Sequence, residues 1–158
     1  MTSTVPEVGA LRPVQLQAWR TFLKAHAQVT RQLEAELVAV QDLSLPSYDV
    51  LVQLSETPER RLRMTELAER VLLSRSGLTR LVDRLVRDGL VVRQACPSDA
   101  RGMLAVLTDA GFDRLRAAWP THLAGVDEHV TSRWSDDEAA LLTQLLGRLT
   151  GDDGTGPG

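Results

Sequence analysis

One amphipathic segment near the start of the chain places the strongest constraint on its fold. From Pro13 to Gln41, apolar residues recur at the three- and four-residue spacing of an α-helix, and proline is well tolerated in the first turn. About 28 residues at roughly 1.5 Å each make a rod of about 40 Å, which is too long to bury one face inside so small a domain. The segment therefore predicts that a two-fold related copy of the chain covers part of this helix.

Length and composition indicate one globular protein without a disulfide framework. The chain has 158 residues, of which 43% are hydrophobic and 25% charged, and its one cysteine is Cys96. The first ten residues lack the basic and apolar regions of a signal peptide, and no apolar run is long enough to span a bilayer. We expect a cytoplasmic protein with no membrane partner.

The middle of the chain has the pattern of helix, turn, helix and β-hairpin. Short helices are predicted at 46–55, 64–71 and 74–88. Thr65 and Ser74 are the expected caps of the second and third of these helices, and Gly89 is the expected stop. β-rich runs follow at 90–94 and 103–107, separated by the turn-forming loop ACPSDARG.

The last third of the chain is again helical. Thr108 is the expected cap of a long helix that reaches about residue 133, and residues 135–138 match a capping box ahead of a final helix. That final helix is so rich in leucine that its apolar face needs a partner.

The segment 74–88 separates an apolar stripe from an arginine-rich face. Residues 60–101 carry ten arginines and five acidic residues, although the whole chain has a net charge of −3. Arginine binds guanine edges and phosphates bidentately, and serine and threonine hydroxyls bond to either. We expect this face to bind double-stranded DNA through Arg75, Ser76, Thr79, Arg80 and Arg84. Two arginines outside the segment, Arg63 and Arg93, are expected to contribute further DNA contacts. Ser74 is expected to serve as a cap and not as a DNA contact.

Asp99 and Arg101 are two residues apart in the predicted hairpin loop, so their side chains can lie on one side and pair. One interpretation is a loop salt bridge that adds little stability. The other is that Asp99 orients Arg101 for insertion into the DNA minor groove. The spacing leaves both interpretations open.

The run from MTELAERV to LTDAG resembles the winged-helix segment of the multiple antibiotic resistance regulator (MarR) family. The helix-turn-helix, the RDGLV strand entry, the D-x-R wing and the LTDAG helix start occur together in order and spacing. The resemblance covers residues 11–150 and implies that two protomers interleave their terminal helices and that Arg101 enters the minor groove. Many members have DRR in the wing where this chain has Asp99, Ala100 and Arg101.

The expected fold is mainly α (α+β): a winged helix-turn-helix with a small β-wing, and long terminal helices that form a dimerisation domain. Residues 11–41 and 108–150 form the dimerisation domain, 46–107 the DNA-binding domain, and 1–10 and 151–158 flexible tails. The expected function is that of a homodimeric transcriptional regulator, a repressor at a pseudo-palindromic operator.

The resemblance also implies a crevice for a small aromatic or anionic effector between the dimer helices and the DNA-binding lobe. Its candidate lining residues are Trp19, Phe22, His26 and Tyr48. Aromatic residues at helical spacing belong to a core more often than to a pocket wall, so these residues also fit a packing role.

Two alternatives remain: a winged-helix protein-interaction module that does not read DNA, and a redox-responsive regulator that uses Cys96 beside Arg93. An enzyme is not expected, because the sequence has no nucleophile with a base, glycine-rich phosphate loop or metal triad. No cofactor or metal is expected. His122 and His129 are seven residues apart and are read as a solvated pair in preference to metal ligands supported by Asp127 or Glu128.

Overall fold

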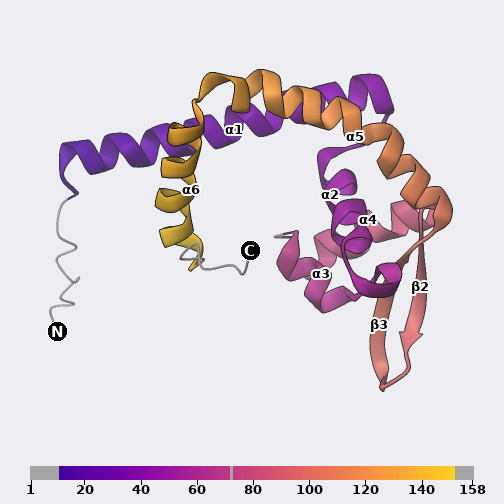
Figure 1. Ribbon diagram of the computed structural model, residues 1–158. Coiled ribbons are helices and arrows are strands. Elements are labelled where there is room, and N and C mark those ends of the chain that lie inside the picture. The colour runs from indigo at the N-terminus through magenta and orange to yellow at the C-terminus, as the bar shows by residue number, and fades with distance from the viewer. Residues whose placement is uncertain (1–10, 72, 152–158) are drawn as a thin grey trace, which may run out of the picture.

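The computed structural model describes residues 11–71 and 73–151, which form a mainly helical molecule with one small antiparallel sheet (Figure 1). Of the predicted tails, 1–10 and 152–158 lie outside the described residues, and Gly151 ends the last helix with a left-handed backbone. In chain order the elements are α1 (Pro13–Gln41), α2 (Leu45–Ser55), η1 (Pro58–Arg60), β1 (Arg61–Arg63), α3 (Met64–Arg70), α4 (Arg75–Arg87), β2 (Val91–Cys96), β3 (Asp99–Leu107), α5 (Asp109–His129), η2 (Thr131–Arg133) and α6 (Asp136–Thr150).

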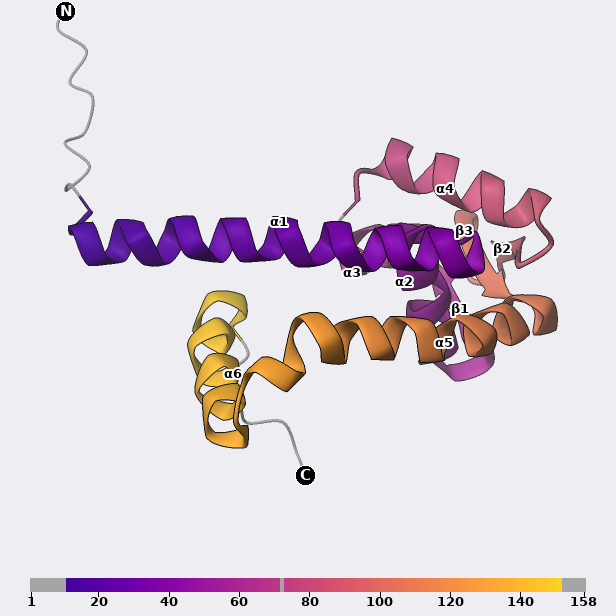
Figure 2. The ribbon, with the colours of Figure 1, turned by 90° about the horizontal axis from the view of Figure 1, so that it is seen from above.

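The long first helix has the predicted bounds and protrudes beyond the rest of the molecule. Proline occupies its first turn, and Asp42 ends it in the left-handed region, with a φ of 50°. Only Leu33 and Leu37 are buried along its length, and both lie toward its C-terminal end. Figure 2 shows this end packed alongside α5, while the N-terminal half of α1 extends past the body of the protein.

The core lies between the helix-turn-helix and the sheet. Its fully buried side chains come from every major element except α6, and they include Leu37, Leu51, Leu54, Leu67, Leu78, Leu85, Val91 and Leu115. α2, α3 and α4 therefore pack as one unit with the sheet, and α1 and α5 each contribute a short buried stretch. The predicted mainly α fold with a small β-wing is confirmed.

The sheet contains a strand that the sequence did not predict. β1, only three residues long, pairs antiparallel with β3, which also pairs with β2, in the order β1-β3-β2. No strand is predicted from the sequence in this segment, in which two of the three residues are arginines. Leu62 alone turns into the core, so the strand is defined by its pairing with β3 and not by an apolar run.

The wing is also longer than predicted. β2 and β3 reach Cys96 and Asp99, so the eight-residue loop of the prediction is reduced to Pro97 and Ser98, next to a register shift at the end of β2. Polar residues near the tip can still belong to the two strands, because strand pairing is made by hydrogen bonds between backbone amides and carbonyls and does not depend on the side chain.

Three of the four expected caps are confirmed, and one is wrong. Ser74, Thr108 and Ser135 each accept a hydrogen bond from the backbone amide three residues ahead. Thr65 does not cap α3: it lies inside that helix, whose N-cap is Arg63 without a side-chain bond. β1 runs directly into α3, so the last residue of the strand occupies the cap position. In the described parts of the chain, no helix is both long and apolar enough to cross a membrane.

Candidate nucleic-acid interface

α4 is held in place by its apolar stripe and by a defined start. The apolar stripe predicted from the helical spacing is buried and consists of Leu78, Leu81, Val82 and Leu85. The Ser74 hydroxyl accepts a hydrogen bond from the Gly77 amide at 3.1 Å, so its oxygen is committed to the helix cap, as expected. The polar face of α4 is thereby fixed relative to the core.

That face is exposed along the whole helix. Its solvent-exposed side chains are Arg75, Ser76, Thr79, Arg80, Asp83, Arg84 and Arg87. Among the described residues, the four arginines of this face form no ion pair. Thr79 donates its hydroxyl proton to the Arg75 carbonyl oxygen at 2.8 Å, so toward a ligand it can act only as an acceptor. The face therefore presents four guanidinium groups and two hydroxyl oxygens on one rigid helix.

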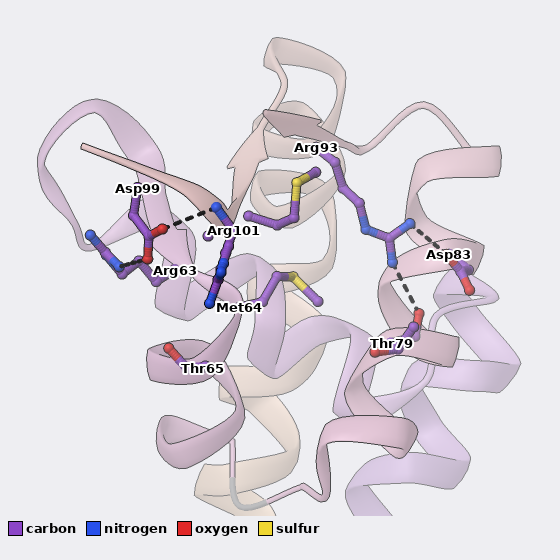
Figure 3. Close-up of a pocket in the computed structure, with 10 residues that line it drawn as sticks. Arg63, Met64, Thr65, Thr79, Asp83, Arg93, Asp99 and Arg101 are labelled. Atoms are coloured by element: carbon purple, nitrogen blue, oxygen red, sulfur yellow. Dashed lines mark hydrogen bonds and ion pairs between the residues drawn. The ribbon is translucent and has the colours of Figure 1, made fainter. Parts of the chain in front are cut away.

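Arg93 is engaged within the protein. From β2 it donates to Asp83 Oδ1 at 2.5 Å and to the Thr79 carbonyl oxygen at 3.3 Å (Figure 3). It therefore ties the wing to α4 and neutralises the one acidic side chain on the exposed face. The prediction of Arg93 as a direct contact could not include this partner, because Asp83 is ten residues away in the chain.

The tip of the wing is organised by Asp99, but not in the way the spacing suggested. Its Oδ1 accepts a hydrogen bond from the Arg101 backbone amide at 3.0 Å, and its Oδ2 lies 3.9 Å from the Arg63 guanidinium. Arg63 also donates to Ser98 Oγ at 3.1 Å. The predicted side-chain pair between Asp99 and Arg101 is therefore wrong. Asp99 fixes the backbone at Arg101 and leaves that guanidinium unpaired among the described residues.

A cleft lies between the wing and the two helices of the helix-turn-helix (Figure 3). Its lining combines the wing with α3 and α4 and consists of Arg63, Met64, Thr65, Thr79, Asp83, Arg93, Asp99, Arg101, Gly102 and Met103. Five of the residues predicted from the sequence to act together (Arg63, Thr79, Arg93, Asp99 and Arg101) meet here. Arg75, Ser76, Arg80 and Arg84 lie outside this cleft, on the exposed side of α4.

The residues predicted to line an effector crevice are not brought together within one chain. Trp19 and Phe22 stack on each other with ring centroids 6.1 Å apart and remain about half exposed on α1, and His26 is exposed as well. Tyr48 is buried in α2, where its ring lies 4.4 Å from that of His122 on α5. The sequence did not pair these two residues, because 74 positions separate them.

His122 sits in this aromatic contact with a polar atom unsatisfied. Its Nδ1 is buried without a hydrogen-bond partner in the described part of the chain, and burial lowers the pKa of its imidazole below the ordinary 6.5. The folded state therefore takes up a proton here less readily than the unfolded state does.

A pH dependence of stability follows from this histidine. With the folded pKa lowered, stability is fully present above pH 6.5 and falls as the pH is lowered through 6.5 toward the folded pKa. We expect His122→Phe to lose less stability than the wild type between pH 7.5 and 5.5 in urea unfolding. His26→Phe, at an exposed position, is the matched control and should behave like the wild type. Equal losses in the wild type and His122→Phe would contradict this assignment.

Cys96 ends β2 at the tip of the wing, and its environment differs from the prediction. Its Sγ is 3.3 Å from Ser98 Oγ, and the side chain is mostly buried. Hydrogen bonding to Ser98, assisted by the charge of Arg63, lowers the pKa of the Cys96 thiol. Arg93, named in the sequence-based hypothesis, does not contribute to this shift.

Comparison with known proteins agrees with the resemblance in the sequence. A protein-family model described as "MarR family" matches residues 41–102. The transcriptional repressor YetL of Bacillus subtilis is 33% identical over 111 residues, which are 70% of this chain and 66% of YetL. AbsC, a MarR family transcriptional regulator from Streptomyces coelicolor, superposes with a TM-score of 0.83 at 34% identity, covering 90% of this chain and 95% of AbsC.

The chain belongs to the MarR family. Its members are transcriptional regulators and not enzymes. A second MarR protein from Streptomyces coelicolor, Sco3205, was solved in complex with DNA. It is 35% identical, with a TM-score of 0.83, and the match covers 94% of this chain and 95% of Sco3205. The winged helix-turn-helix predicted from the sequence is thus the fold of known MarR regulators.

Proposed function

We propose that the chain is a homodimeric repressor that binds a pseudo-palindromic DNA operator. The observation that carries this proposal is the exposed arginine face of α4 beside the guanidinium of Arg101 in the wing, none of which forms an ion pair within residues 11–71 and 73–151. A helix in the major groove and a wing arginine in the adjacent minor groove require this arrangement. The complex of Sco3205 with DNA and the name of YetL as a repressor support it by similarity.

In this proposal the direct contacts are Arg75, Ser76, Thr79, Arg80, Arg84 and Arg101. Arg63, Arg93 and Asp99 act through other residues. Arg93 neutralises Asp83, Arg63 lies beside Asp99, and Asp99 fixes the backbone that carries Arg101. Asp83 would otherwise repel phosphates from the centre of the α4 face.

The proposed division of labour follows the burial pattern. Residues 46–107 contain the helix-turn-helix and wing and supply most of the core, so they form the DNA-binding part. Residues 11–41 and 108–150 form the dimerisation part, because large apolar side chains stay exposed on α1 and α6: Val14, Trp19, Phe22, Leu23, Leu141, Leu145 and Leu149. A partner's helices that cover them would also complete a crevice over Trp19 and Phe22 for a small aromatic or anionic effector. A thermal-shift screen of phenolic ligands would identify such an effector.

DNA binding is tested by removing single arginines. After an operator has been selected from a random duplex pool, Arg80→Ala, Arg84→Ala and Arg101→Ala should each weaken binding by about 1–3 kcal/mol. A variant that loses a phosphate contact should also reduce the slope of log affinity against log salt by about 1. The charge-matched control is Arg116→Ala, on the exposed side of α5, which should bind like the wild type.

The result also separates the proposal from its main alternative. A winged-helix module that contacts proteins and not DNA would give no selected sequence and a weak, sequence-independent salt response. Unchanged footprints in all three variants would exclude the proposed contacts.

A further inference from the structure

Three side chains that commonly bind metals meet where the last turn of α5 lies against α1. Glu36 comes from α1, and Glu128 and His129 come from α5. His129 Nε2 lies 2.5 Å from Glu36 Oε1, and one ligand atom from each of the three residues lies within 4.8 Å of the other two. The His129 side chain is only 10% exposed, so its imidazole is held in this position by packing.

The backbone of α5 has the shape needed for this close approach. A Cβ atom at Gly125, one turn before His129, would lie 2.4 Å from Glu36 Oε2 and 2.9 Å from Leu33 Cδ2. Glycine therefore allows the Glu36 carboxylate to lie directly against the helix beside the imidazole. This packing holds two of the three donors, while the exposed Glu128 can swing toward them.

The donor set selects a class of metal. Zinc-like divalent ions accept one imidazole nitrogen with carboxylate oxygens at about 2.0–2.2 Å, whereas Mg²⁺ and Ca²⁺ prefer oxygen alone. A tetrahedral ion with such bonds separates its ligand atoms by about 3.3 Å. The 2.5 Å pair must therefore open slightly, and Glu128 must move inward, both of which are side-chain adjustments. Two carboxylates around a neutral imidazole also match a charge of +2.

We propose that Glu36, Glu128 and His129 bind one zinc-like divalent transition metal, with water in the fourth position. The ion joins α1 to the end of α5 opposite the wing (Figure 1). The site is independent of DNA recognition, since none of its residues belongs to the α4 face or the wing. The solvated pair of His122 and His129 predicted from the sequence is wrong: His129 is mostly buried against Glu36, 93 residues away, and His122 Nδ1 is buried elsewhere.

Metal titration of the intact, chelator-treated chain tests the proposal. Isothermal titration with Zn²⁺ should give one site per chain at micromolar concentrations, and Co²⁺ should give the strong visible absorption of a tetrahedral site. Glu128→Gln is the decisive variant, because it leaves the His129–Glu36 contact intact and should weaken Zn²⁺ binding at least about tenfold. His129→Gln should abolish the Co²⁺ spectrum.

Two controls exclude other sources of binding. His26→Gln removes an exposed histidine of α1, and Cys96→Ser removes the thiol, and both variants should bind Zn²⁺ like the wild type. Wild-type protein that binds no Zn²⁺ at micromolar concentrations, or Glu128→Gln that binds as tightly as the wild type, would leave Glu36 and His129 as an ion pair only and would overturn the proposal. DNA binding by the same samples reports separately on the proposed function.

Discussion

Replacing Gly111 with alanine is expected to destabilise the protein by about 3 kcal/mol. Gly111 lies in the first turn of α5, where a Cβ atom would sit 2.1 Å from the Leu90 carbonyl oxygen and 2.6 Å from Leu107 Cδ1. Neither neighbour can yield easily, since one is backbone and the other belongs to the core. Overpacking of this kind costs about 1–3 kcal/mol or more, and the higher helix propensity of alanine returns at most about 1 kcal/mol.

The measurement is urea or thermal unfolding, with a loss in melting temperature of roughly 10 °C for a chain of this length. Gly77 is a matched control, because it occupies the same position in the first turn of α4. Its amide donates a hydrogen bond to the capping residue Ser74, as the Gly111 amide does to Thr108. Among the described residues, a Cβ atom at Gly77 would meet only the Ser74 hydroxyl, at 3.1 Å. Gly77→Ala should therefore change stability by less than about 1 kcal/mol. Equal effects at the two glycines would refute the packing argument.

The second large effect concerns the proposed dimer. Leu141 and Leu145 lie one turn apart on α6, are 54% and 45% exposed, and belong to a helix in which no residue is buried. In the proposed dimer they are covered by the partner, so Leu141→Glu/Leu145→Glu would place two charges in an apolar interface, which is strongly unfavourable. We expect this double variant to be a folded monomer at micromolar concentrations by light scattering.

Loss of the dimer should also weaken DNA binding, by about a hundredfold or more, because the second half-site is then no longer bound within one complex. The control Ala140→Glu/Thr143→Glu adds the same charge to the opposite side of α6, where both residues are exposed. It should remain dimeric. A double leucine variant that stays dimeric would show that α6 does not form the interface.

Local features of the fold could be predicted well from the sequence. The bounds of α1 and the caps Ser74, Thr108 and Ser135 depend on neighbours within one helical turn, and all of them were predicted correctly. β1 was missed because a three-residue strand with one apolar side chain has no local signal apart from the polar, apolar, polar order of its residues. The partner strand that stabilises it is about 40 residues away.

The candidate site shows the same division. The exposed face of α4 follows from helical periodicity, so Arg75, Arg80 and Arg84 could be placed from the sequence. The engagement of Arg93 with Asp83 and of Asp99 with Arg63 depends on how the wing folds against the helices. Sequence spacing could therefore identify which residues gather there, but not which of them remain unpaired.

Thr108 joins three elements and so determines which movements the molecule can make. Its hydroxyl accepts from the Gly111 amide and donates to the Gly89 carbonyl oxygen at 2.7 Å, while its own amide donates to Leu90. These hydrogen bonds hold the end of α4, the end of the wing and the start of α5 in a fixed relative position. A ligand that tilts α5 would therefore move α4 and the wing together as a rigid body. In the proposed dimer, the distance between the α4 helices of the two protomers would then decide whether both reach their half-sites.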